Sequence, residues 1–82
     1  MISGEEAVVV YWRPGCGFCE HLRAVLGDDA DKARWINIWD DEEAASFVRG
    51  VNDGNEVVPT VVIGGVAHTN PDPGVVLDAL SR

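Results

Sequence analysis

The sequence is short of cysteine, of basic residues and of long apolar runs, and each shortage excludes a class of protein. Only two of its 82 residues are cysteine, whereas a secreted domain of this size usually carries several disulfides. Six basic residues stand against 14 acidic ones, for a formal net charge of −8, and the basic residues form no stripe. We therefore expect a protein of the reducing cytoplasm that binds neither nucleic acid nor an anionic membrane.

No apolar run is long enough to cross a membrane. The stretch Met1-Ile2-Ser3-Gly4-Glu5-Glu6 lacks the basic region and the apolar core of a signal peptide. A hydrophobic content of 46% suits a globular protein with one core. We expect a single domain over residues 1–82 that is present as a monomer.

Both cysteines lie in one stretch, Arg13-Pro14-Gly15-Cys16-Gly17-Phe18-Cys19, between an expected strand and an expected helix. Residues 7–12 form an apolar, β-branched and aromatic run that predicts a buried strand. After the cysteines, four apolar residues are spaced to share one helical face: Phe18, Leu22, Val25 and Leu26. Gly27 is the expected end of this helix. The Cys-x-x-Cys therefore lies where open α/β sheets usually carry their reactive sites.

The start of the helix gives the two cysteines different expected roles. Only a thiolate attacks a disulfide, and the unpaired N–H groups of a first helical turn carry roughly half a positive charge. These groups, together with the nearby cation Arg13, should stabilise a sulfur anion on Cys16. Cys19 lies one turn further on, toward Leu22 and the core, and should remain a thiol. We predict that Cys16 is the catalytic nucleophile and Cys19 the resolving or auxiliary thiol.

Zinc sites and permanent disulfides also use closely spaced cysteines, but neither suits this pair. A zinc site needs four ligands, and the only other soft ligands, His21 and His68, stand at no familiar ligand spacing. A permanent disulfide between such close cysteines closes a very short loop and would constrain the unfolded chain little. We therefore expect a redox role and no bound metal.

The rest of the chain predicts three more strands and two more helices. Residues 33–39 favour a strand parallel to the first, with Trp35 and Trp39 as packing residues. Of the two acidic clusters, residues 28–31 predict a solvated loop and residues 40–43 a helix start capped by Asp40 or Asp41. The apolar face expected for this second helix consists of Ala44, Phe47, Val48 and Val51.

Residues 57–68 hold two short apolar runs around Gly64-Gly65, which predicts an antiparallel hairpin beginning at Pro59. Asp72 and Pro73 then suit the start of a last helix. The residues of this helix that should face inward are Val76, Leu77 and Leu80. The expected fold is therefore of the α/β class, with the order β-α-β-α-β-β-α.

This order, with a Cys-x-x-Cys after the first strand, resembles the thioredoxin superfamily, and the chain length resembles its glutaredoxin branch. Residues 13–19 resemble the family's basic-Pro-x-Cys-x-aromatic-Cys signature, and Val57-Val58-Pro59-Thr60 resembles its Thr-Val-Pro motif. Further stretches resemble the mycoredoxins, the glutaredoxin-like proteins of mycothiol-using actinobacteria: Ile36-Asn37-Ile38-Trp39-Asp40, residues 44–49 with 51–55, and Thr69-Asn70-Pro71. The resemblance implies a central four-stranded mixed sheet flanked by three helices.

The resemblance also implies an activity. A mycoredoxin-like protein would reduce mixed disulfides between mycothiol and proteins through the Cys16 thiolate. Its partners would be mycothiolated proteins and mycothiol itself, with mycothiol disulfide reductase and NADPH closing the cycle indirectly. No cofactor would be bound.

The substrate-binding residues implied by the resemblance are Arg13, Val58, Pro59, Thr69 and Asn70. A cis Val58–Pro59 bond should place the backbone of Val58 beside Cys16. Ordinary glutaredoxins carry Gly-Gly-Cys-Asp or a similar segment where this chain has Thr69-Asn70-Pro71-Asp72. This difference disfavours glutathione as the thiol.

Two alternatives stay open. The first is a dithiol redoxin that reduces protein disulfides through Cys16 and Cys19, with its own electrons coming from a thioredoxin-reductase-like flavoenzyme. The second is a dimer that holds an iron–sulfur cluster through two Cys16 thiolates and two small thiols. Gly17 suits such a dimer, but most cluster carriers of that branch have serine where this chain has Cys19.

Overall fold

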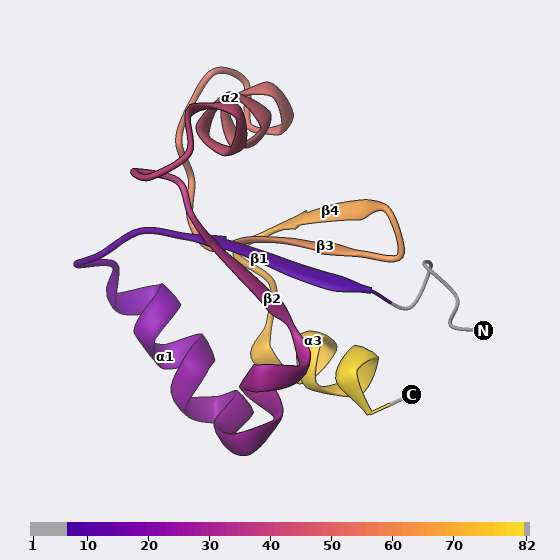
Figure 1. Cartoon of the computed structure of the whole chain (residues 1–82). Helices are drawn as coiled ribbons and strands as arrows, with labels where there is room; N and C mark the ends of the chain where they lie inside the picture. Colours follow the sequence, from indigo (N-terminus) through magenta and orange to yellow (C-terminus); the bar gives the residue numbers. More distant parts are fainter. Residues whose placement is uncertain (1–6, 82) are drawn as a thin grey trace.

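The computed structural model describes residues 7–81, whose elements follow the predicted order with one added 3-10 helix (Figure 1). Residues 1–6, on which the expectation of no signal peptide rests, lie outside the described residues, as does Arg82. In chain order the elements are β1 (Val8–Trp12), α1 (Gly17–Leu26), η2 (Gly27–Lys32), β2 (Arg34–Asn37), α2 (Glu42–Val51), β3 (Thr60–Ile63), β4 (Val66–Thr69) and α3 (Pro73–Leu80).

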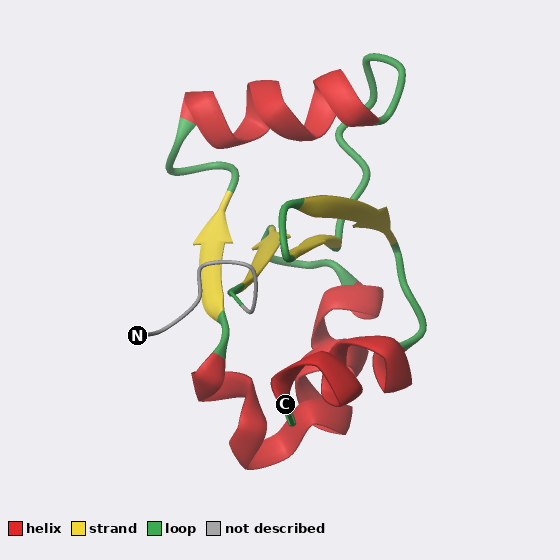
Figure 2. Cartoon of the chain, turned by 90° about the vertical axis from the view of Figure 1, so that its right-hand side faces the viewer, coloured by secondary structure: helices red, strands yellow, loops and turns green. Residues whose placement is uncertain are grey.

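The strands form a 4-stranded mixed sheet in the order β2-β1-β3-β4. Strands β1 and β2 are parallel, whereas β1 pairs with β3, and β3 with β4, in the antiparallel sense. Helix α2 covers one face of the sheet, and α1 and α3 lie together on the other (Figures 1 and 2). The predicted glutaredoxin-type architecture is therefore confirmed. None of the helices within residues 7–81 is long and apolar enough to cross a membrane.

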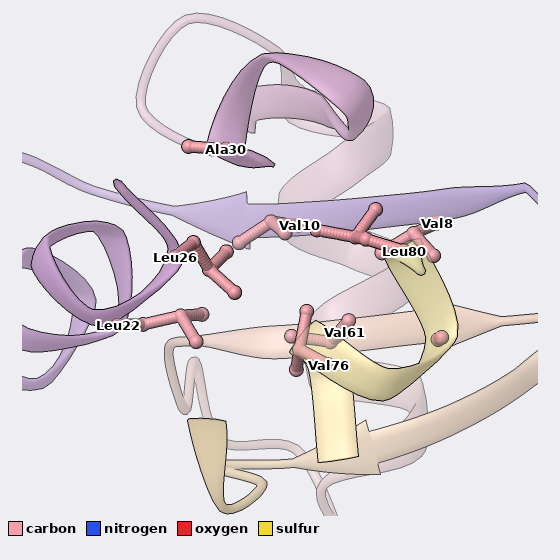
Figure 3. Packing of buried hydrophobic residues seen from close by; sticks show 9 residues of the cluster. Val8, Val10, Leu22, Leu26, Ala30, Val61, Val76 and Leu80 are labelled. Carbon is pink, nitrogen blue, oxygen red and sulfur yellow. The ribbon is translucent and has the colours of Figure 1, made fainter. Parts of the chain in front are cut away.

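Each face of the sheet has its own apolar cluster. The larger one fills the space under α1 and α3 and is shown in Figure 3; its members are Val8, Val10, Leu22, Leu26, Ala30, Val61, Val76, Ala79 and Leu80. The smaller one lies toward α2 and consists of Cys16, Cys19, Ile38, Ala44, Ala45, Val48 and Val58. Because full burial of a valine or leucine side chain contributes about 1.5–3 kcal/mol, the larger cluster supplies most of the driving force. Both cysteines belong to the smaller cluster, so the redox motif is also part of the core.

The buried face of α1 differs from the predicted one. Cys19, Leu22 and Leu26 are buried, whereas Phe18 and Val25 are 65% and 43% exposed. Leu22, Leu26 and Cys19 are therefore buried as predicted, with Cys19 in the smaller cluster, whereas the predictions for Phe18 and Val25 were wrong. Phe18, the neighbour of Cys19, therefore lies at the surface.

The buried face of α2 also differs in part from the prediction. Ala44 and Val48 are buried as expected, and Ala45 is buried with them, whereas Phe47 and Val51 are 38% and 42% exposed. Small alanines let the helix approach the sheet closely, which leaves the larger Phe47 at the margin. There its ring packs against Tyr11 with the centroids 5.1 Å apart.

Two loop and strand predictions are corrected. The acidic stretch 28–31 is not a solvated loop but part of η2, because Ala30 is buried in the larger cluster and its carbonyl accepts the Trp35 indole N–H at 2.7 Å. Gly27, with φ +57°, ends α1 as predicted. Strand β2 is shorter than the predicted 33–39, and Trp39 lies beyond its end with 63% of its surface exposed.

The remaining boundaries follow the predicted signals. Asp41 caps α2 by accepting the N–H of Ala44 at 3.1 Å, and Asp72 caps α3 by accepting that of Gly74 at 2.9 Å. Strands β3 and β4 form the predicted hairpin, which begins directly after Pro59.

Candidate active site

Cys16 is the N-cap of α1. Its backbone is extended, with φ −93° and ψ 110°, and its sulfur accepts the N–H of Cys19 at 3.2 Å. The preceding Gly15 has φ +78°, a conformation that glycine adopts without steric cost, and this turn brings the chain into the cap. The sulfur therefore occupies the place that serine or aspartate oxygens usually take at a helix start, where the helix dipole favours negative charge.

Val58 lies directly opposite Cys16. The Cys16 S–H donates to the Val58 carbonyl with an S–O distance of 3.5 Å, and the Val58–Pro59 peptide bond is cis, as predicted. Cys16 is only 5% exposed and Val58 8% exposed. The nucleophilic sulfur predicted from the sequence therefore lies beside one backbone carbonyl in a largely apolar wall.

Cys19 has the environment of a protonated thiol. It is 3% exposed, and both cysteines are free. Burial raises the pKa of Cys19 to about 12, with a further rise from its hydrogen bond to Cys16 and an opposing effect of the Arg13 backbone. These surroundings favour the protonated form that the sequence predicts for this residue.

The Arg13 side chain, predicted to be a cation near Cys16, packs against an aromatic ring. Its guanidinium lies over the Trp39 ring, 5.8 Å from the centroid, and its Nη1 donates to the Pro14 carbonyl at 3.2 Å. An exposed cation over an indole gains about 0.5–1 kcal/mol, enough to favour this position. The Arg13 guanidinium is thus paired with the Trp39 ring.

A groove of about 320 Å³ opens beside the cysteine motif. It is lined by residues of α1, of the Pro59 segment and of the approach to α3: Phe18, His21, Leu22, Pro59, Asn70, Pro71, Asp72 and Pro73. Among the predicted binding residues, Pro59 and Asn70 line this groove. The Thr69 hydroxyl instead donates to the Asn52 side chain at 2.5 Å, and Thr69 is absent from the groove wall.

Six residues that line this groove were not among the predicted binding residues: Phe18, His21, Leu22, Pro71, Asp72 and Pro73. The apolar spacing favours a core position for Phe18, and His21 was considered only as a metal ligand. A signal was present, since His21 follows Phe18 by three residues and so lies on the same side of a helix.

A second cavity, of about 270 Å³, reaches Cys19 from the α1 and β2 side of the motif. Its lining consists of Trp12, Arg13, Pro14, Gly15, Cys19, Glu20, Arg23 and Trp35. The Arg23 guanidinium lies 4.9 Å from the Trp35 ring centroid, so these two lining residues form a cation–π pair. Cys16 lines neither this cavity nor the groove, which agrees with its near-complete burial.

The arrangement suits thiol–disulfide exchange. A sulfur at a helix N-terminus can act as attacking and leaving group, a neighbouring backbone edge can align a substrate, and the residue whose N–H bonds this sulfur carries a second thiol. Within residues 7–81, no group of three or more His, Cys, Asp or Glu side chains is placed to hold a metal ion.

Comparison with known proteins agrees with this chemistry. Residues 8–68 match the family described as Glutaredoxin. Mycoredoxin 1 of Corynebacterium glutamicum is 40% identical over 65 residues, which cover 78% of this chain and 80% of that protein. A putative glutaredoxin of Mycobacterium tuberculosis is 36% identical over 66 residues, which cover 79% of each chain.

Proposed function

The chain belongs to the glutaredoxin family of thiol–disulfide oxidoreductases, and we propose that its substrates are mixed disulfides between mycothiol and proteins. The observation that carries this proposal is the Cys16 sulfur at the α1 N-cap, facing the Val58 carbonyl. The similarity to Mycoredoxin 1 supports mycothiol as the thiol. So does the Asn70-Pro71-Asp72 wall of the groove, which offers hydrogen-bonding groups to the hydroxyls of a pseudo-disaccharide.

In the first step the Cys16 thiolate attacks the mycothiol sulfur of the mixed disulfide. The bond between mycothiol and the protein sulfur breaks, and the protein thiolate leaves and takes a proton from solvent. Mycothiol is now joined to Cys16. The Cys19 N–H that bonds the Cys16 sulfur stabilises its negative charge before attack and again when it leaves.

In the second step the thiolate of another mycothiol attacks the mycothiol sulfur held on Cys16. The Cys16 thiolate is released, together with mycothiol disulfide. Mycothiol disulfide reductase and NADPH then regenerate mycothiol, so the domain itself needs no bound cofactor. Because this electron supply belongs to the cytoplasm, the protein would work there, as a monomer in which one chain provides both thiols and the groove.

Val58 aligns the substrate in this proposal. When Cys16 loses its proton, the sulfur can no longer donate to the Val58 carbonyl, and that carbonyl becomes available to an amide of the incoming thiol. Pro59 and Asn70 line the groove beside it, and Arg13, in the cavity on the other side of the motif, attracts acidic protein segments.

The test is NADPH consumption in a system coupled through mycothiol disulfide reductase, with a mycothiolated peptide as substrate. The same peptide carrying glutathione, with glutathione and glutathione reductase, is the comparison. We expect turnover with mycothiol and much weaker turnover with glutathione. Equal or better turnover with glutathione would exclude the proposed thiol specificity.

A dithiol pathway is the second candidate function, because Cys19 lies in hydrogen-bond contact with Cys16. In this pathway Cys19 loses its proton, attacks the Cys16 sulfur and displaces mycothiol or a substrate thiol, which leaves an intramolecular disulfide. Reduction of that disulfide by a thioredoxin-reductase-like flavoenzyme, without mycothiol, would favour this pathway. Failure of that reduction together with full activity of Cys19→Ser would exclude it.

A further inference from the structure

Asn52, at the end of α2, joins three separate elements through its side chain. Its amide nitrogen donates to the Val48 carbonyl at 2.8 Å and to the Thr60 hydroxyl at 3.2 Å, while its amide oxygen accepts the Thr69 hydroxyl at 2.5 Å. The Thr60 hydroxyl in turn donates to the Val57 carbonyl at 2.7 Å. The network thus runs from α2 to the first residue of β3 and the last residue of β4.

The two threonines that Asn52 holds are direct partners across the hairpin, because Thr60 pairs with Thr69 in the register of β3 and β4. Each stands next to a residue that lines the groove: Pro59 precedes Thr60, and Asn70 follows Thr69. The Asn70 N–H also donates to the Pro59 carbonyl at 2.8 Å. Asn52 therefore secures the two sides of the hairpin just where they enter the site.

The same network reaches the segment opposite the cysteine. Val57, whose carbonyl accepts the Thr60 hydroxyl, precedes Val58, whose carbonyl accepts the Cys16 S–H. Thr60 is fully buried, so water cannot replace a lost partner there without rearrangement. The N-cap hydrogen bond of the Cys16 sulfur lies within α1, and the link of this sulfur to Val58 is an S–H donation that the thiolate no longer makes.

We propose that Asn52 is a positioning residue, which sets the Val58 carbonyl and the Asn70 side of the groove for the mycothiol part of the substrate. It touches neither sulfur nor groove, and so acts through Thr60 and Thr69. Only an amide supplies both the two donors and the acceptor used here, and an aspartate would keep the acceptor alone. This inference rests on the proposed function and adds a residue outside the site that positions the groups aligning its substrate.

The test compares two substrates in wild type, Asn52→Asp, Asn52→Ala and the control Asn55→Ala. Asn55 lies in the same loop and donates one exposed hydrogen bond to the Asn52 carbonyl, without contact to either threonine. The first substrate is the mycothiolated peptide, measured as kcat/KM in the coupled assay. The second is 5,5′-dithiobis(2-nitrobenzoic acid), a small disulfide that reports on the Cys16 sulfur and lacks the mycothiol part.

We expect both Asn52 variants to lower kcat/KM for the mycothiolated peptide roughly 10-fold, because small misplacements of aligning groups are costly. Their rate with the small disulfide should stay within about twofold of wild type, as should both rates of Asn55→Ala. If Asn52 had a purely structural role, its variants would react more slowly with both substrates. That result, or an unchanged kcat/KM for the mycothiolated peptide, would overturn the proposal. The same four proteins are also assayed with the glutathionylated peptide. If wild type shows no preference for the mycothiolated peptide, the proposed function is refuted. The comparison of the Asn52 variants with wild type still tests the positioning role.

Discussion

The amide N–H of Cys19 lies 3.2 Å from the sulfur of Cys16, so the first cysteine of the motif caps the helix that carries the second. This one contact links folding and chemistry. It satisfies a helix N–H that would otherwise need another partner, and it places the charge of a Cys16 thiolate against the positive end of α1.

Replacing Cys16 by serine should abolish activity without unfolding the protein. The serine hydroxyl is a good N-cap and can accept the Cys19 N–H, so the free energy of unfolding should change by less than about 1 kcal/mol. Turnover of the mycothiolated peptide should fall at least roughly 100-fold because the nucleophile is lost. Cys19→Ser serves as the control and should keep at least part of the activity. Residual turnover by Cys16→Ser near the wild-type rate would contradict the assignment of the nucleophile.

Cys19 should make the folded state less stable as the pH rises. Below about pH 8.5 the thiol is protonated in both states, and its ionisation contributes no difference in stability. Above that pH the unfolded thiol ionises, whereas burial keeps the folded pKa at about 12, so the folded state loses relative stability over this range. Urea unfolding at pH 7.5 and pH 10 should show a larger loss for wild type than for Cys19→Ala. Equal losses in the two proteins would mean that Cys19 ionises as readily in the folded state as in the unfolded chain.

The observed burial along α1 predicts different outcomes for two neighbouring residues. Leu26 is 3% exposed within the larger apolar cluster, so Leu26→Ala should lower the free energy of unfolding by about 2–5 kcal/mol. Val25 is 43% exposed, so Val25→Ala should change it by less than about 0.5 kcal/mol. Chemical denaturation of the two variants measures both values. A comparable decrease in the free energy of unfolding for Val25→Ala would mean that the Val25 side chain is part of the core.

His21 should contribute to binding and not to sulfur chemistry. It lines the groove one helical turn from Phe18, where its imidazole would bond a hydroxyl of the proposed mycothiol substrate. Losing one such bond costs about 0.5–1.5 kcal/mol, so His21→Ala should raise KM for the mycothiolated peptide roughly 2-fold to 12-fold. Reaction with 5,5′-dithiobis(2-nitrobenzoic acid) should not change, and His21→Asn should restore part of the affinity. Glu20→Ala, in the cavity on the other side of the motif, is the matched control. An unchanged KM in His21→Ala would mean that His21 does not contact the substrate.

Much of this protein follows from local patterns in its sequence. The order of the elements, the caps at Asp41 and Asp72, the end of α1 at Gly27 and the hairpin at Gly64-Gly65 were all predicted and are confirmed. Each depends on interactions among residues a few positions apart, which a single sequence displays directly. The Cys-x-x-Cys at a helix start belongs to the same class, because the cap joins residues three positions apart.

Tertiary structure decided what depends on residues far apart in the chain. The sequence predicted that both Phe18 and Cys19 face inward, but only Cys19 is buried, in the smaller cluster with Val58, whereas Phe18 is 65% exposed. The 3-10 helix at 27–32 forms because Ala30 is buried in the larger apolar cluster, although its neighbours in the sequence are acidic. The groove is formed by α1, the Pro59 segment and the approach to α3. The Asn52 network joins the end of α2 to strands β3 and β4. Neither feature lies within one short stretch of the sequence, so local patterns did not predict them. Hydrogen bonds and packing between residues far apart in the chain depend on how the strands pair and how the helices pack on the sheet. The pattern of neighbouring residues does not encode this arrangement.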